Sequence, residues 1–557
     1  DFSLAGGPAA GAMRPRLARP ALSVETLALL CALFLILTGN GPLWRAALAG
    51  RDWHAPGTWS FAAALLVALS ALHFVLLGLV ASRHTVKPLL SVLVLCTAFA
   101  SYYMERYSIF LDRTMLRNVL ATDYKEAREL LAWGMVPHLV VSGAFPLALL
   151  WWPRLKQVRL RSALVKRLLW LGAALVIAVA SLLAVFADFA SLMRNQPALR
   201  YLITPGNGVV ALARNALGRA QAPAQARTRV GEDAKLGAAW AGRQRPALFV
   251  LVVGETARAA NFSLNGYARE TNPLLARRDV VSFSAVTACG TSTEVSLPCM
   301  FSPFGRADYD EDRIQSHESL LHVLARAGFQ VLWRDNQSGC KGVCEGLSAQ
   351  QLDHAQVPAL CFEGQCLDEV LLHGMEGVAR DAAGNLFVVM HQLGSHGPAY
   401  YRRYPGVFKR FVPACESDDL RHCSQQEIVN AYDNSLLYTD YFLSRVVDLL
   451  DRSQSHDDTA MIYVSDHGES LGENGLYLHG MPYSVAPAVQ KQVPMLVWLS
   501  PALRRSFGVD GECLRAHAKA PASHDNLFHS VLGLLDVQTV VYRRPLDVFA
   551  PCRVASG

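Results

Sequence analysis

The hydrophobic pattern of the chain changes near residue 190. Before this point long apolar runs are separated by short basic segments, and from residue 246 short apolar runs alternate with amphipathic ones. A helix needs about 20 apolar residues to cross the hydrocarbon core of a bilayer. We therefore predict a membrane domain followed by a soluble domain, with five spans, two of them short, at about 23–39, 59–81, 88–104, 137–152 and 168–187.

The basic residues predict the orientation of these spans. Arg83, His84 and Lys87 separate the second and third spans, and the segment 154–167 between the fourth and fifth is rich in Arg and Lys. Short loops with this composition stay in the cytoplasm. The N-terminus should then be cytoplasmic, and everything after residue 190 should lie outside.

We expect four segments along the chain. Residues 1–12 look like a remnant of cloning, and the native start is predicted at Met13, with no cleavable signal. Residues 13–190 form the membrane domain, 191–245 a short helix and linker, and 246–557 the outer domain. Within the first part, the loop 105–136 has near-helical apolar spacing. It is either an amphipathic helix pair on the membrane surface or a helix packed on the outer domain.

The outer domain has the pattern of an α/β fold. Continuous apolar runs of strand length occur at 247–253, 385–391, 459–465 and 493–499. Such runs are typical of strands covered on both faces. Helical patterns lie between them, at 318–327, 425–452 and 524–535. We predict a mostly parallel sheet with helices on both sides.

The cysteines indicate an oxidising compartment for the outer domain. Cys31 and Cys96 lie in apolar spans, whereas the other ten follow residue 288, mostly as close pairs. Zinc ligation by cysteine pairs is the alternative, but the spacings do not repeat a C-x-x-C site. Nearest-neighbour pairing, and elimination for the last pair, predicts Cys289–Cys299, Cys340–Cys344, Cys361–Cys366, Cys415–Cys423 and Cys513–Cys552.

Several side chains that can bind a metal follow predicted strands. Glu255 follows the first run, and Asp466 and His467 follow the third. Ligands bind beyond the carboxyl ends of strands in α/β sheets, and this donor set suits zinc. Thr293, within the stretch CGTSTEVSLPC, is the candidate nucleophile, activated by the metal.

Each of these residues also has an ordinary structural interpretation. Glu255 could be an acid at a helix N-terminus, and Asp466 and Thr293 could be helix caps. His396, five residues after the second run, and His479 could be ordinary polar residues in loops. The placement of several such groups at strand ends favours a shared site.

Five longer motifs resemble the signatures of one family. They are VVGETARAANFSLNGYARETNP, CGTSTEVSLPCMFS, DNQSGCKGVC, GSHGPAYYRRYP and SDHGESLGENGLYLHGMP. They are similar to motifs of the lipid A phosphoethanolamine transferases, which include the mobilised colistin-resistance enzymes, and the resemblance covers nearly the whole chain from Met13. It implies a five-helix membrane domain and an alkaline-phosphatase-like periplasmic domain related to sulfatases.

The resemblance also implies roles for individual residues. It implies one tightly bound zinc at Glu255, Thr293, Asp466 and His467, with a second zinc possible. It implies that His396 and His479 serve the substrate phosphate or the second metal. Thr291, Asn336 and Lys341 fall in motifs that line the pocket.

The implied reaction moves phosphoethanolamine from phosphatidylethanolamine to a phosphate of lipid A through a phosphoethanolamine-threonine intermediate. It would lower the affinity of the outer surface for polymyxin-type peptides. The implied protein is a monomer of the bacterial inner membrane with a periplasmic catalytic domain and no nucleic-acid partner.

Three alternatives to this function remain open. One is another acceptor, such as an inner-core sugar or a periplasmic glucan. A second is a zinc phosphodiesterase or sulfatase-type hydrolase, although sulfatases use a matured cysteine or serine and Thr293 is neither. The third, a membrane sensor that only binds lipid, is disfavoured by the complete set of candidate ligands.

Overall fold

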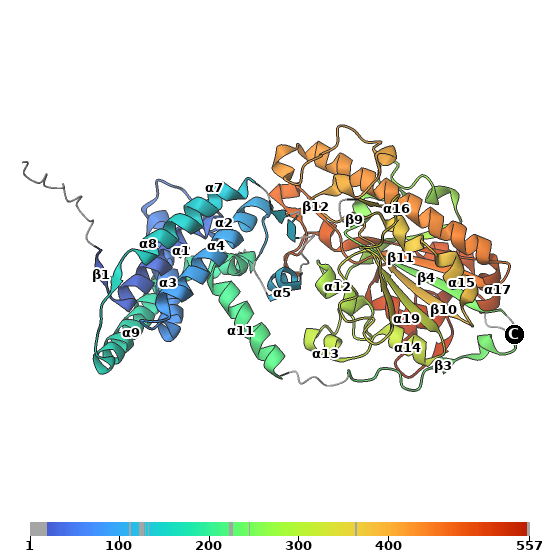
Figure 1. Cartoon of the computed structure of the whole chain (residues 1–557), viewed down its shortest axis with the longest axis horizontal. Coiled ribbons are helices and arrows are strands. Elements are labelled where there is room, and N and C mark those ends of the chain that lie inside the picture. Colours follow the sequence, from blue (N-terminus) through green and yellow to red (C-terminus); the bar gives the residue numbers. More distant parts are fainter. Residues whose placement is uncertain are drawn as a thin grey trace, which may run out of the picture. The chain divides into compact units, whose positions relative to one another are not determined.

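The computed structural model describes residues 19–553, except 111–112, 122–126, 129, 132, 196, 222–226, 244 and 363–364. The expected cloning remnant at 1–12 lies outside the described residues. The chain divides into two compact units. The first contains residues up to 102, 134–199 and 203–206, and the second contains 103–133, 200–202 and everything from 207 onward (Figure 1).

The first unit is helical. Three of its helices are long and apolar enough to cross a membrane, namely α3 (Pro56–Val80), α4 (Val86–Tyr107) and α9 (Leu160–Ala184). A fourth span results if α1 (Val24–Thr38) and α2 (Gly41–Leu48), bent by 62°, count as one.

The expected number of five spans is not reached by this measure in the part of the chain that the structure describes. The remaining apolar segment, Met135–Trp151, is shorter than the others. It consists of α7 (Met135–Leu139), a π-helical turn and α8 (Phe145–Trp151). The basic connection before α9 contains β2 (Arg154–Leu155), which pairs with β1 (Ala21–Leu22).

A buried polar network lies where α1 ends. The Asn40 side chain donates to the carbonyls of Leu35 and Thr204 at 2.9 and 2.8 Å. The Nε2 atom of His73, in α3, accepts a hydrogen bond from the amide of Gly206 at 3.1 Å. Buried polar groups are stable only when paired, so these bonds hold the segment 203–206 against the helices of the first unit. This segment lies between α10 (Phe186–Asn195) and α11 (Gly206–Gln221).

The second unit contains an eight-stranded sheet with the order β15-β5-β14-β11-β4-β10-β6-β7. Strand β14 is antiparallel to β11 and β5, and the other pairings are parallel. The sheet is therefore mostly parallel, as predicted. The strands are β4 (Ala247–Gly254), β5 (Val280–Thr287), β6 (Gln330–Asp335), β7 (Ser348–Gln351), β10 (Leu386–His391), β11 (Asp458–Ser465), β14 (Gln492–Leu499) and β15 (Ala522–Ser523).

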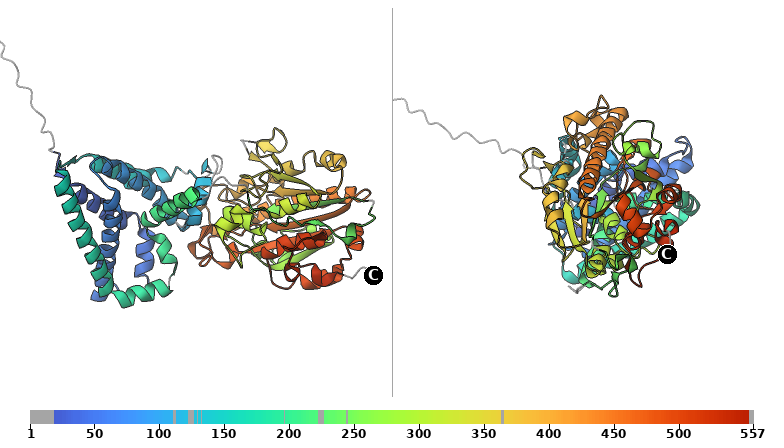
Figure 2. Two further views of the ribbon diagram at one scale, coloured as in Figure 1. Left: turned by 90° about the horizontal axis from the view of Figure 1, so that it is seen from below. Right: turned by 90° about the vertical axis from the view of Figure 1, so that its right-hand side faces the viewer.

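Alternate residues of β4 belong to different cores because successive side chains of a strand point to opposite faces. Phe249 and Leu251 pack with α12 (Thr293–Met300), α14 (Leu320–Arg326) and α17 to α19. Leu248 and Val250 pack with the long α16 (Gln425–Ser453) and with α15. Helices thus cover both faces of the sheet (Figures 1 and 2). The further helices of the unit are α13 (Glu311–Ser316), α15 (Met375–Asp381), α17 (Pro501–Phe507), α18 (Gly511–His517) and α19 (Asp525–Leu534).

Helix α5 (Arg113–Ala121) packs on the second unit. Arg117 forms an ion pair with Glu311 of α13. A Cβ atom at Gly480 would lie 2.6 Å from Cε of Met115, so α5 lies close against the chain there. Of the two interpretations of the loop 105–136, the structure favours packing on the outer domain for this helix.

Five disulfides join ten cysteines of the second unit. The pairs are Cys289–Cys299, Cys340–Cys344, Cys361–Cys366, Cys415–Cys423 and Cys513–Cys552. Cys31 and Cys96, in helices of the first unit, are free thiols. These are the pairs that the spacing along the chain predicts.

Candidate metal and nucleophile site

Three acidic and imidazole groups meet at the carboxyl end of the sheet. Glu255 follows the last residue of β4, and Asp466 and His467 follow the last residue of β11. Because Ser465 pairs with Gly254 across the two parallel strands, these side chains emerge side by side. The three residues are at most 1 % exposed, and one ligand atom from each lies within 4.8 Å of the others.

Thr293 brings a hydroxyl into this cluster. It is the first residue of α12, after the N-cap Ser292. Its Oγ1 donates to Oε2 of Glu255 at 2.9 Å and lies 3.4 Å from Nε2 of His467. The Cys289–Cys299 disulfide closes the stretch that contains this helix. The chain therefore fixes a hydroxyl, two carboxylates and an imidazole around one point.

Backbone hydrogen bonds orient the ligand atoms. Nδ1 of His467 lies 3.0 Å from the carbonyl oxygen of Gly468, to which it donates in the tautomer that leaves Nε2 unprotonated. Oδ1 of Asp466 accepts from the amides of His467 and Thr256 at 2.7 and 3.3 Å. Such bonds to the far side of a ligand set its tautomer and direction. They turn Nε2 of His467 and Oδ2 of Asp466 toward each other, at 3.4 Å.

The electrostatics of the pocket favour a bound cation. Burial raises the pKa of the Asp466 carboxyl and lowers the pKa of His467 well below its ordinary value. The pocket thus disfavours isolated charges of either sign, whereas a divalent cation would compensate the two carboxylates. Two carboxylates, one imidazole and a hydroxyl form a donor set that fits zinc.

A glycine allows the chain to pass close behind Glu255. Gly394 has a φ of +55°, and a Cβ atom there would lie 2.6 Å from the carbonyl oxygen of Glu255. The next residue, Ser395, donates its amide to the same oxygen at 3.1 Å. Only glycine fits both the left-handed backbone and this close approach. The loop that carries His396 therefore packs directly against the backbone of Glu255.

The two expected substrate histidines lie beside the cluster. The ring centroids of His396 and His479 are 5.4 Å apart, and those of His467 and His479 are 4.4 Å apart. Nδ1 of His479 lies 2.8 Å from Oε2 of the buried Glu469, which also accepts from the Tyr400 hydroxyl at 2.6 Å. The carboxylate can therefore hold His479 with Nδ1 protonated and Nε2 available.

The other expected pocket residues are less uniform. Thr291 is buried, and its hydroxyl donates to the carbonyl of Met481 at 2.6 Å, which ties it to the chain just after His479. Asn336 points into the structure, where Nδ2 donates to Cys366 O and Asp368 Oδ1, both at 2.9 Å. The neighbouring Gln337 instead donates from Nε2 to Oε2 of Glu255 at 2.8 Å. It is Gln337, rather than Asn336, that the structure places against the cluster.

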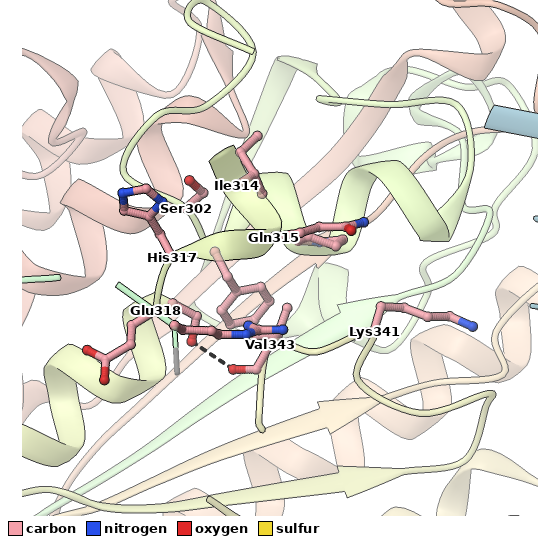
Figure 3. Close-up of a pocket in the computed structure, with 11 residues that line it drawn as sticks. Ser302, Ile314, Gln315, His317, Glu318, Lys341 and Val343 are labelled. Atoms are coloured by element: carbon pink, nitrogen blue, oxygen red, sulfur yellow. Dashed lines mark hydrogen bonds between the residues drawn. The ribbon is translucent and has the colours of Figure 1, made fainter. Parts of the chain in front are cut away.

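Lys341 lies further along the same motif. Its Nζ is 3.8 Å from Oε2 of Glu294, the residue after Thr293. It lines a hollow together with Ser302, Gln315 and Val343, and its side chain extends away from these residues (Figure 3). The lysine is thus held next to α12, the helix that begins with Thr293, and not next to Glu255, Asp466 or His467.

Sequence reasoning missed three residues of the site. Gln337 lies within the DNQSGC motif and Glu469 within SDHGES, so both stood in stretches that already looked functional. Gly394 lies two residues before His396. For Gln337 and Gly394 the missing signal was three-dimensional, because both contact Glu255, which is distant in the sequence. Glu469 lies only ten positions from His479, but the sequence does not show that the two side chains are bonded.

Comparisons with known proteins identify the family to which the chain is related. A sulfatase family model matches residues 247–537, and a model described as phosphoethanolamine transferase EptA/EptB matches 69–219. The chain is 42 % identical over 466 residues to phosphoethanolamine transferase EptA of Salmonella typhimurium, with 83 % of this chain and 85 % of that protein covered.

Two further relatives cover nearly the whole chain. Phosphatidylethanolamine transferase Mcr-2 of Escherichia coli is 35 % identical, with 91 % of this chain and 94 % of that protein covered. The structure of the integral membrane lipooligosaccharide phosphoethanolamine transferase A from Neisseria meningitidis matches with a TM-score of 0.90 at 35 % identity, covering 96 % of this chain and all (100 %) of that one. With its two units, its sulfatase-type sheet and its strand-end cluster, the chain belongs to the phosphoethanolamine transferase family.

Proposed function

We propose that the protein transfers phosphoethanolamine from phosphatidylethanolamine to a phosphate of lipid A, with Thr293 as nucleophile. One observation carries this proposal: the Thr293 hydroxyl lies 2.9 Å from Glu255 and 3.4 Å from Nε2 of His467, among groups that suit a metal. Relatives that carry the names phosphoethanolamine transferase and phosphatidylethanolamine transferase support the group transferred and its donor.

Zinc would be held by Glu255, Asp466, His467 and the Thr293 oxygen. When bound there it would lower the pKa of the hydroxyl, as it does for water. The buried carboxylates beside Thr293 would hold the metal and keep bulk water out, and the hydrogen bond from Thr293 to Glu255 orients the hydroxyl. Cofactor identity is part of the proposal and rests on this donor set.

In the first half of the reaction, the Thr293 oxygen, whose proton would pass to solvent when the metal binds, forms a bond to the phosphorus of phosphatidylethanolamine. The bond from phosphorus to the glycerol oxygen breaks, and diacylglycerol leaves. His396 or His479 supplies the proton that this oxygen needs. The imidazoles can also donate to the phosphoryl oxygens, where negative charge increases in the transition state. The product is phosphoethanolamine esterified to Thr293.

In the second half, an oxygen of a lipid A phosphate attacks the same phosphorus. The bond to Thr293 breaks, its oxygen returns to the deprotonated state, and the proton that the attacking phosphate oxygen loses restores the histidine. Both substrates are lipids, which explains why the catalytic unit is joined to apolar helices. The added ethanolamine carries a positive charge. It would reduce the attraction of the outer surface for cationic polymyxins.

Mass spectrometry of lipid A from expressing cells tests this function. Wild-type protein should add phosphoethanolamine to a lipid A phosphate, and Thr293→Ala should not. Diacylglycerol release from fluorescent phosphatidylethanolamine without any modified lipid A would identify a phosphodiesterase. If only a core sugar or a glucan is modified, the proposed acceptor is wrong and the proposed transfer reaction still holds.

A further inference from the structure

His524 bonds to two segments that carry the candidate site. It directly precedes α19 and is buried, with 1 % of its surface exposed. The amide of Cys289 donates to its Nδ1 at 3.1 Å, and its Nε2 donates to the carbonyl of Ser465 at 2.9 Å. Its own amide donates to the carbonyl of Thr287 at 3.0 Å, which fixes the residue at the end of β5.

Cys289 and Ser465 lie just before the two segments that carry the residues of the candidate site. Cys289 opens the disulfide-closed stretch in which Thr293 begins α12. Ser465 is the last residue of β11, directly before Asp466 and His467. We propose that His524 is a positioning residue that sets the distance between the Thr293 oxygen and the Asp466-His467 pair. This inference rests on the proposed function only in taking these three residues to share one metal.

The hydrogen bonds require one protonation state of His524. Nδ1 must be unprotonated to accept from Cys289, and Nε2 must carry a proton to donate to Ser465. Burial lowers the pKa of His524 to about 4, so the neutral ring persists at neutral pH. An imidazolium would place a donor against the Cys289 amide. The neutral ring therefore holds the two segments at a fixed distance through its two hydrogen bonds, and it does not carry a proton between them.

Other contacts of the nucleophile stretch lead elsewhere. The Tyr483 hydroxyl donates to the carbonyl of Ala288 at 3.0 Å, and the amide of Ala288 donates to Lys491 O at 2.7 Å. These bonds hold the stretch to the chain before β14. Among the described residues, His524 is the side chain that hydrogen-bonds both the nucleophile stretch and the end of β11. Losing either bond should loosen the geometry of the site more than the fold.

Two substitutions separate the two bonds. In His524→Asn the amide oxygen can occupy the position of Nδ1, which keeps the bond from Cys289 and loses the one to Ser465. In His524→Gln the amide nitrogen can reach the position of Nε2, which keeps the bond to Ser465 and loses the other. The double loss is represented by His524→Ala.

The chain offers a matched control in helix α19, which His524 directly precedes. His529 is also buried, with 1 % exposed, and burial also lowers its pKa to about 4. Its Nδ1 accepts from the amide of Arg543 at 3.1 Å, outside the site. His529→Asn therefore removes a comparable buried imidazole without touching either half of the site.

The measurements are kcat and KM for phosphatidylethanolamine, the zinc dissociation constant by chelator competition, and the thermal midpoint, all on the full chain in detergent. We expect each His524 variant to lose about 10- to 100-fold in kcat and to bind zinc more weakly, with KM within about twofold. His529→Asn should keep kcat and zinc affinity within about twofold of the wild type. Its thermal midpoint should fall by about as much as in the His524 variants.

His524 variants that match His529→Asn in both kcat and zinc affinity would overturn the proposal. If the wild-type protein does not turn over phosphatidylethanolamine, the proposed function fails. The zinc measurement then still decides the positioning role, because it does not depend on turnover.

Discussion

Glu469 and His479 form a hydrogen-bonded pair, with Nδ1 of the imidazole 2.8 Å from Oε2 of the carboxylate. The carboxylate is fully buried, whereas 18 % of the His479 side chain is exposed. The buried carboxylate thus holds an imidazole that is itself partly exposed. A carboxylate in this position fixes the tautomer and the orientation of the ring.

Glu469→Gln should therefore impair turnover more than metal binding. The amide keeps the shape but removes the charge that holds Nδ1 protonated, so we expect kcat to fall about 10- to 100-fold. Zinc content should stay near that of the wild type. Tyr400→Phe is the matched control, because it removes only the 2.6 Å bond from the tyrosine hydroxyl to the other carboxylate oxygen. Equal losses in the two variants would argue against a special role for the pair.

Thr293→Ala should abolish transfer while the fold persists. The variant removes the attacking oxygen but only a small buried volume, so we expect a loss of roughly 10³-fold or more in turnover of phosphatidylethanolamine. Thr293→Ser retains a hydroxyl and should keep part of the activity. The thermal midpoint and the disulfide content of both variants serve as controls for folding. Wild-type turnover in the alanine variant would refute the assignment of the nucleophile.

Substitutions of the proposed metal ligands and of the proposed substrate-binding histidines should have different effects on zinc content. Glu255→Gln and Asp466→Asn keep shape but lose a charged ligand, so zinc content and activity should fall together. His396→Ala and His479→Ala should lose turnover and keep the tightly bound zinc. Zinc content of each purified variant, measured beside its rate, decides between these outcomes. Full zinc in both carboxylate variants would exclude the proposed ligand set, and loss of all zinc in the histidine variants would make the histidines ligands.

Local sequence patterns predicted much of the second unit. The apolar runs became β4, β10, β11 and β14 because continuous hydrophobic segments of this length suit a sheet covered on both faces. The antiparallel direction of β14 was not predictable, because direction depends on the connections before it and not on its own residues. Likewise the bend between α1 and α2 depends on the contacts of Asn40, which a hydropathy pattern does not contain.

The site shows the same division. Glu255, Asp466 and His467 were predictable because each directly follows a strand. Gln337 was not, since only the fold decides which of two adjacent amides faces Glu255. His524 reaches Cys289 across 235 positions and Ser465 across 59, through a helix that packs on the sheet. Contacts of this range are set by tertiary packing, and no local motif encodes them.

Peptide mapping without reduction should recover the five disulfides. The Cys513–Cys552 pair closes the longest loop, with a sequence separation of 39. Constraint of the unfolded chain by such a loop stabilises the fold by about 4 kcal/mol in the loop-entropy model. Cys513→Ser with Cys552→Ser should therefore lower the thermal midpoint more than the same double change at Cys361 and Cys366, whose separation is 5. Free thiols at these ten positions would contradict the pairing.

Asp440 should make the stability of the second unit depend on pH. It lies in α16 and is buried, and its two carboxylate oxygens accept from the amides of Leu274 and Leu275 at 2.9 and 3.0 Å. Burial raises its pKa from the ordinary 3.8 to about 7, although the two amides oppose the shift. The folded state therefore favours the protonated carboxyl group, whereas in the unfolded chain the same group is ionised at neutral pH.

The sign of the effect follows from this difference. A carboxyl whose pKa is raised by folding stabilises the fold below its unfolded pKa, and this contribution is lost as the pH rises from about 4 to about 7. Asp440→Asn cannot ionise and lacks this loss, but it leaves one of the two amides without its acceptor, at about 1 kcal/mol. Relative to that of the variant, the free energy of unfolding of the wild type should fall by about 2–3 kcal/mol between pH 5 and pH 8. The measurement is the difference between the two thermal midpoints, which should fall by roughly 3–4 °C over this range, because the entropy of unfolding of so large a unit is high. A constant difference would show that Asp440 is ionised in the folded protein at every pH tested.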